Sequence, residues 1–266
     1  MSEASIDREK LLEFHQLVLP KETVASLSAR DKKRLLMLTS MMRDMDLYRK
    51  MLIYGGKQKT GNAKIDETVF VTLIFSTSKI LISKVYEVWK FVDSEKIVTE
   101  KEGFSENLLC RWNEVEAFFS EVKNKKLFSF IRNKFGFHFD HYQEIEAYIE
   151  KAMEEVGDLE FWMGSDSSGN DVFSFSNTVM LTVLRNKMTE LGFVGNEEAL
   201  IGQLQKLPII ISHSINEFCK GYLTEVLLDG KIFHQKLKVD VMAPLLSEVN
   251  LPWIVKNDLN RTGQFL

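Results

Sequence analysis

The chain has 266 residues, of which 45% are hydrophobic and 27% are charged, a composition typical of a globular protein and unlike that of a disordered one. Its formal net charge of −4 excludes a uniformly basic protein that coats nucleic acid, although a local basic surface remains compatible with it. Only four prolines and 14 glycines interrupt the chain, which favours long helices. We therefore expect a mainly α protein, a bundle of long antiparallel helices.

Residues 1–156 are predicted to form an N-terminal helical bundle. Apolar residues recur at helical spacing, three or four positions apart, through most of this part of the chain. A capping box that starts at Ser28 divides the second helical segment, and Ser105 is the expected cap of a later one. The predicted helices cover residues 6–18, 22–54, 65–93, 105–122, 123–136 and 141–156.

Residues 157–266 are predicted to hold a small β-hairpin near 159–175 and then the C-terminal helices, either as a separate unit or packed into the same domain. Two short alternating runs flank a turn rich in Ser, Gly and Asn, which is the pattern of a hairpin. Asn196 is expected to cap one helix and Pro208 to start another at its first turn. The predicted helices are 177–191, 196–206 and 208–228, and the tail 231–266 is expected to be irregular apart from a short helix at 241–249.

A few residues indicate where in the cell the protein is expected and whether it is expected to bind a metal. Cys110 and Cys219 are far apart and lack metal-ligand spacing, which favours a reduced, cytoplasmic protein. The N-terminus is too polar for a signal peptide, and residues 69–82 are too few and too polar to span a bilayer, so we expect a buried helix there and no membrane partner. His213 and Glu217 lie one helical turn apart without a third ligand, so we expect a hydrogen-bonded pair and no metal site.

The stretch 123–140 stands out from the rest of the chain. Leu127, Ile131 and Phe135 recur every four residues and predict one apolar stripe of a helix. No acidic residue lies between residues 122 and 139, whereas the same stretch holds five cations: Lys123, Lys125, Lys126, Arg132 and Lys134. A local positive field attracts a phosphate backbone. The alternative is a solvated helix face whose lysines complement the helix dipole.

Arg132, Asn133 and His138 are the candidate catalytic residues. Arg132 and His138 would converge if the helix ends near Gly136, since glycine is the usual residue just past a helix end, and a new helix starts after Asp140. An arginine can grip two phosphate oxygens, and a histidine can move a proton at neutral pH. Asn133 could orient the 2′-hydroxyl or the phosphate. These residue types suit cleavage of an RNA phosphodiester.

The pattern Arg132-Asn133-x4-His138 resembles the Arg-x(4–6)-His signature of the HEPN superfamily, in which a polar residue often follows the arginine. The resemblance covers about seven residues and a helical context. It implies a helical bundle and a metal-independent endoribonuclease without a cofactor, of the kind found in toxin–antitoxin and other defence systems. It also implies catalytic roles for Arg132 and His138, support from Asn133, a homodimer that joins two motifs in one cleft, and a possible protein inhibitor or partner. RNA would contact Lys123, Lys125, Lys126 and Lys134.

The alternative is a non-catalytic helical protein that binds another macromolecule or assembles. In that interpretation His138 packs among the neighbouring phenylalanines, and Arg132 pairs with a helix carboxylate. The broad apolar face of segment 22–54, with its four methionines at 41, 42, 45 and 51, supports it, because methionine suits adaptable binding surfaces as well as cores.

Overall fold

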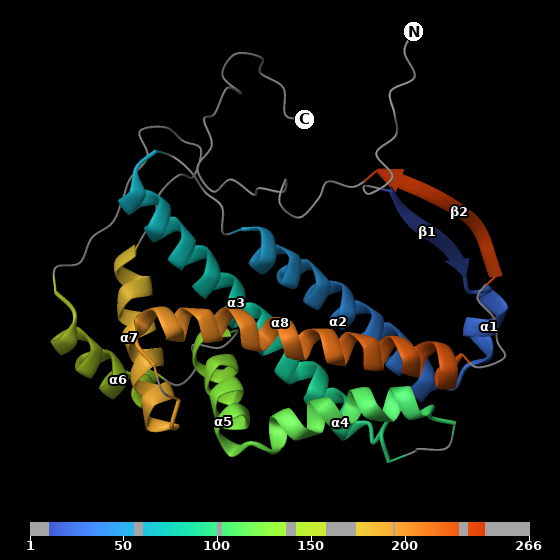
Figure 1. Cartoon of the computed structure of the whole chain (residues 1–266). Coiled ribbons are helices and arrows are strands. Elements are labelled where there is room, and N and C mark those ends of the chain that lie inside the picture. The colour runs from blue at the N-terminus through green and yellow to red at the C-terminus, as the bar shows by residue number, and fades with distance from the viewer. Residues whose placement is uncertain are drawn as a thin grey trace, which may run out of the picture.

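A computed structural model describes residues 11–55, 61–99, 103–136, 142–157, 174–193, 195–228 and 234–242 (Figure 1). These residues form a mainly helical bundle, as the composition predicted. Its helices are α1 (Lys21–Ser26), α2 (Ala29–Tyr54), α3 (Ala63–Ser94), α4 (Glu106–Ser120), α5 (Val122–Ile131), η2 (Arg132–Gly136), α6 (Tyr142–Glu155), α7 (Ser174–Glu190), α8 (Glu197–Gly221) and η3 (Tyr222–Leu227). The two strands are β1 (Leu11–Val18) and β2 (His234–Met242).

The predicted caps set the helix starts. The Ser28 hydroxyl accepts a hydrogen bond from the backbone N–H of Asp31 at 3.1 Å. The helix α2 begins at Ala29, directly after Ser28, so the segment 22–54 is indeed two helices. Ser105 accepts the N–H of Leu108 at 3.2 Å at the start of α4. Such side chains satisfy backbone N–H groups that have no partner within the helix.

The helix α3 is the centre of the bundle, and α2 and α8 pack against it (Figure 1). Among the residues that the structure describes, it is the one helix long and apolar enough to cross a membrane, but 61% of its most apolar window is buried by neighbours. It pairs antiparallel with α2, since Arg34 contacts Glu95 while Asp44 contacts Lys84. Its burial agrees with the expected core helix.

The helix α8 corrects the prediction of two helices at 196–206 and 208–228. It runs without a break from Glu197 to Gly221, with Pro208 inside it. A proline removes one backbone hydrogen bond and bends a helix, but Leu204, Ile211 and Ile215 are all buried on either side of Pro208. Packing of this long apolar face against α2, α3 and α4 therefore outweighs the local break (Figure 1). One hydrophobic core contains residues from both predicted parts of the chain.

The strands correct two further predictions. Residues 11–18 form β1 instead of part of a helix, and the tail contributes β2, where an irregular segment was expected. The strands pair antiparallel, from Leu11 opposite Met242 to Val18 opposite His234, with an irregularity between Gln16 and Leu17. The pairing joins segments more than 200 residues apart, so spacing within either segment could not reveal it. The hairpin predicted near 159–175 falls on residues outside the described part until Ser174, where α7 begins.

Candidate nucleic-acid interface

The helix is interrupted at Glu121, between α4 and α5. This allows α5 to run at a steep angle to α4 and to pack against α3 (Figure 1). Glu121 has an extended conformation (φ −67°, ψ 111°), which ends α4. The predicted apolar stripe is confirmed, since Leu127, Ile131 and Phe135 are each at most 5% exposed. Burial of this stripe determines which side of α5 is left to solvent.

At Arg132 the α-helix widens into the π-helical turn η2, which extends to Gly136. Short π-helical turns are rare and occur frequently at functional sites. Phe135 in this turn packs edge-on against Phe75 of α3, with ring centroids 6.2 Å apart. Arg132, predicted on the last turn of a helix, is instead the first residue of η2, which continues α5 and contacts α3.

Two neighbours hold the Arg132 side chain, which is 30% exposed. Its Nε donates to Glu87 Oε1 of α3 at 2.5 Å, and its Nη1 donates to Asn133 Oδ1 at 2.9 Å. Asn133 in turn donates to the Ser129 hydroxyl at 3.3 Å. Within the described residues, Nη2 has no hydrogen-bond partner, so one edge of the guanidinium remains for a ligand.

Glu87 is a site residue that sequence reasoning missed. It lies 45 residues before Arg132, and nothing in its local pattern links it to the Arg-Asn motif. The alternative interpretation had foreseen a carboxylate partner for Arg132 without naming it. The sequence offers one weak signal that Glu87 has a specific role: it is the first acidic residue of α3 after Glu67. His138 falls within residues 137–141, outside the described part, so its position relative to Arg132 is not defined.

Helical geometry divides the predicted RNA-binding lysines between two faces. Lys125 precedes Arg132 by seven residues, about two helical turns, so both lie on the side of α5 that adjoins α3. Lys125 Nζ lies 5.5 Å from the centroid of the Trp89 ring. Lys123 and Lys126 are three residues apart and lie toward α7. Lys134, in η2, is half-buried.

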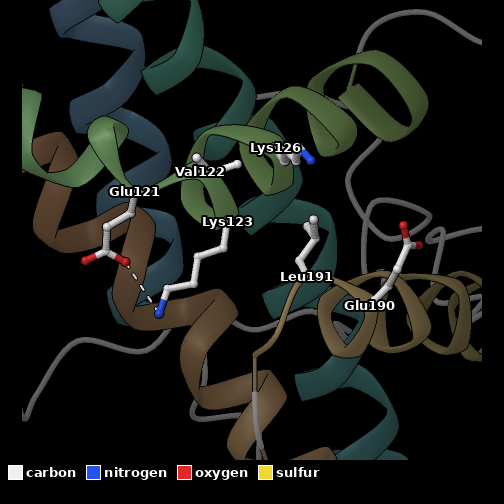
Figure 2. Close-up of a pocket in the computed structure, with 6 residues that line it drawn as sticks. All are labelled: Glu121, Val122, Lys123, Lys126, Glu190 and Leu191. Atoms are coloured by element: carbon white, nitrogen blue, oxygen red, sulfur yellow. Dashed lines mark ion pairs between the residues drawn. The ribbon is translucent and has the colours of Figure 1, made fainter.

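The face toward α7 forms a shallow hollow of about 480 Å³ (Figure 2). Its lining mixes charges: Glu121, Val122, Lys123, Lys126, Glu190 and Leu191. Lys123 pairs with Glu121 at 3.4 Å, and its ammonium also lies 5.5 Å from the Phe193 ring. A hydrogen bond from Lys187 holds the pKa of Glu190 below its usual value, so this carboxylate is anionic at neutral pH. The negative charges of Glu121 and Glu190 therefore disfavour the binding of a phosphate in this hollow.

The geometry of the described residues also limits metal binding and thiol chemistry. No three His, Cys, Asp or Glu side chains among them are placed to bind a metal ion. The expected His213–Glu217 pair is replaced by two other contacts: His213 Nδ1 lies 3.4 Å from Arg49 Nη1, and Glu217 lies 3.6 Å from Lys220. The reason is that α8 packs on α2, which brings Arg49 to His213. Burial raises the pKa of Cys219 to about 12, so its thiol is not a nucleophile at neutral pH.

Comparison of the chain with protein-family models, curated protein sequences and solved structures gave no match. Function is therefore inferred from the chain's own geometry, in which Arg132, Asn133, Glu87 and Lys125 form a single surface between α3 and η2.

Proposed function

We propose that this protein binds RNA on the surface formed by α3, α5 and η2 and cleaves it as a HEPN-like, metal-independent endoribonuclease. The observation that carries the proposal is the oriented Arg132 guanidinium, held on one side by Glu87 and on another by Asn133. A cation fixed before the substrate arrives stabilises the developing charge of a pentavalent phosphate without reorganising. Lys125 on the same face adds attraction for the phosphate backbone.

Each residue has a distinct role in the proposed reaction. Arg132 stabilises the phosphate through its outer edge, while Glu87 and Asn133 keep the guanidinium in place. His138 moves the proton between the 2′-hydroxyl and the leaving oxygen, for which a group with a pKa near neutral is suited. A homodimer would bring two copies of the motif to one cleft, as the HEPN resemblance implies.

The experiment is RNA cleavage by the purified protein in EDTA, compared with Arg132→Ala and His138→Ala. Loss of an oriented cation or of a proton-transfer group lowers the rate about 100-fold or more. Arg43→Ala is the matched control, because Arg43 is 76% exposed on α2 and takes no part in the proposed site. Cleavage that survives EDTA and disappears in both site variants supports the proposal. Cleavage that requires a divalent ion, or that persists in both variants, refutes it.

A non-catalytic interaction protein is the second candidate, and exposed apolar side chains of α2 and α8 favour it. Leu36 and Leu47 are 68% and 54% exposed, and their separation of 11 residues, about three turns, places them on the same side of α2. Ile210 of α8 is 65% exposed. If wild type cleaves no RNA while Leu36→Asp and Leu47→Asp change its oligomeric state in sedimentation, this second function replaces the first.

A further inference from the structure

Trp89 of α3 lies two residues after Glu87 and contacts aromatic and cationic side chains. Its ring is 8% exposed and stacks on Phe119 of α4 at a centroid distance of 4.3 Å and an angle of 15°. Tyr86 tilts against the same ring at 5.5 Å. Phe119 and Tyr86 therefore bury most of the indole and fix its position.

Two ammonium groups gather over this one ring. Lys90 Nζ lies 4.8 Å from the ring centroid and Lys125 Nζ lies 5.5 Å from it. Since both distances are measured to the same centroid, the two ammonium nitrogens lie within about 10 Å of each other. The attraction of a cation to an indole face holds each lysine in place, but like charges at this separation repel each other.

Neither lysine has a carboxylate partner among the described residues. Lys84, on the same helix as Lys90, does have one, since it contacts Asp44 at 2.8 Å. Glu87 and Asp93 each lie three residues from Lys90 in the sequence, and the Glu87 carboxylate accepts the hydrogen bond from Arg132. The side chains of Glu87, Lys90, Lys125 and Arg132 therefore sum to a charge of +2 at neutral pH.

We propose that Lys90 and Lys125 together bind a backbone phosphate of single-stranded RNA over Trp89, adjacent to the phosphate that Arg132 contacts. An anion placed between the two ammonium groups removes their mutual repulsion and neutralises the excess charge of the surface. The inference rests on the proposed function and extends it by a residue, Lys90, that lies 33 positions before the basic stretch 123–134. Lys90 and Lys125 position the strand, while Arg132 acts on the phosphate that is cleaved.

The test measures binding of a short, fluorescently labelled, 2′-O-methyl oligouridine, which lacks the attacking hydroxyl and so is not cleaved. Fluorescence anisotropy is recorded over a range of salt concentrations for wild type, Lys90→Gln and Lys125→Gln. At ~0.1 M salt each variant binds about fivefold more weakly, and the slope of log K against log salt falls by about 0.7, as for one lost phosphate contact on a single strand. Lys90→Arg, which keeps the charge, restores most of the affinity. Lys50→Gln, an exposed lysine of α2, is the control and changes neither quantity.

The outcomes separate this inference from the proposed function. Equal affinity and equal salt slope in wild type, Lys90→Gln and Lys125→Gln overturn the inference, while cleavage that depends on Arg132 can still stand. Weaker binding in both variants, together with no cleavage of unmodified RNA by wild type, supports the phosphate site and refutes the endoribonuclease. An oligouridine that wild type does not bind overturns the inference as well. Circular dichroism of each variant shows that the helices remain folded.

Discussion

Two clusters of positively charged side chains pack against the C-terminal part of α3, and they differ in whether every cation contacts a carboxylate. In the first, Arg30, Lys33 and Arg34 of α2 all contact Glu95. In the second, Arg132 has Glu87, whereas Lys90 and Lys125 have only the Trp89 ring among the described residues. The difference indicates that the first cluster stabilises the fold and that the second is available to an anion.

Arg34 is the most buried side chain of the first cluster. Its side chain is 4% exposed, its Nη2 donates to the Glu95 carbonyl at 2.6 Å, and its Nη1 donates to the Tyr222 hydroxyl at 3.1 Å. One arginine thus connects α2, the end of α3 and η3. A buried charge is tolerated only when it is paired and hydrogen-bonded in this way.

The largest expected effect is on stability, from Arg34→Met. The change removes a buried cation from its ion pair with Glu95 and removes its hydrogen bonds to the Tyr222 hydroxyl and the Glu95 carbonyl, and breaking such a buried contact costs about 3–5 kcal/mol in the free energy of unfolding. Urea denaturation at pH 7 measures it. Arg43→Met, at a position 76% exposed, is the control and changes stability by less than about 0.5 kcal/mol. A loss below about 1 kcal/mol in Arg34→Met would show that the two clusters do not differ as described.

The next effect is expected for Glu87→Gln, which weakens the partner of Arg132 and removes a negative charge from the second cluster. Cleavage falls about tenfold because the guanidinium is held less firmly, while binding of 2′-O-methyl oligouridine becomes tighter because the surface gains a unit of positive charge. Parallel measurement of kcat and of the dissociation constant checks this divergence. A decrease in both cleavage and binding would contradict a positioning role and indicate general damage to the surface.

A smaller effect is the dependence of stability on Glu95 at low pH. The hydrogen bond from Lys33, with Arg30 and Arg34 nearby, lowers the pKa of Glu95 from its ordinary value of 4.5. The unfolded chain therefore takes up the proton first as pH falls, so the stabilisation present above pH 4.5 is lost below it. In Glu95→Gln the loss of stability between pH 7 and pH ~3, measured by urea denaturation, should be smaller than in wild type. Identical pH dependence in wild type and variant would exclude the assignment.

The smallest effect is expected for the stability of Lys90→Gln. Since Lys90 has no described carboxylate partner and faces another cation, its neutralisation leaves the free energy of unfolding within about 0.5 kcal/mol of wild type or raises it slightly. Lys33→Gln, which loses its contact with Glu95, is the paired variant and is destabilised by up to about 1 kcal/mol. Thermal unfolding of the two variants side by side distinguishes them. A larger loss of stability in Lys90→Gln than in Lys33→Gln would contradict the proposed difference between the two clusters.

The sequence by itself determined the features that depend on residues within one or two helical turns. The caps at Ser28 and Ser105 were predicted correctly, because a cap bonds to a backbone group three residues later. The helix predicted to end at residue 191 ends at Glu190, and Gly192 follows with a φ of 83°, a conformation that glycine adopts without steric strain. The buried stripe of α5 followed from its four-residue spacing.

Only the tertiary structure decided the features that join distant segments. The β1–β2 pair and the continuation of α8 through Pro208 both depend on partners that local patterns do not contain. Within the candidate site, tertiary packing brought Glu87 to Arg132, placed Lys125 beside Trp89, and directed Lys123 and Lys126 toward α7. The physical reason is that helical periodicity specifies which side chains share a face, whereas the packing of α5 on α3 determines what each face meets.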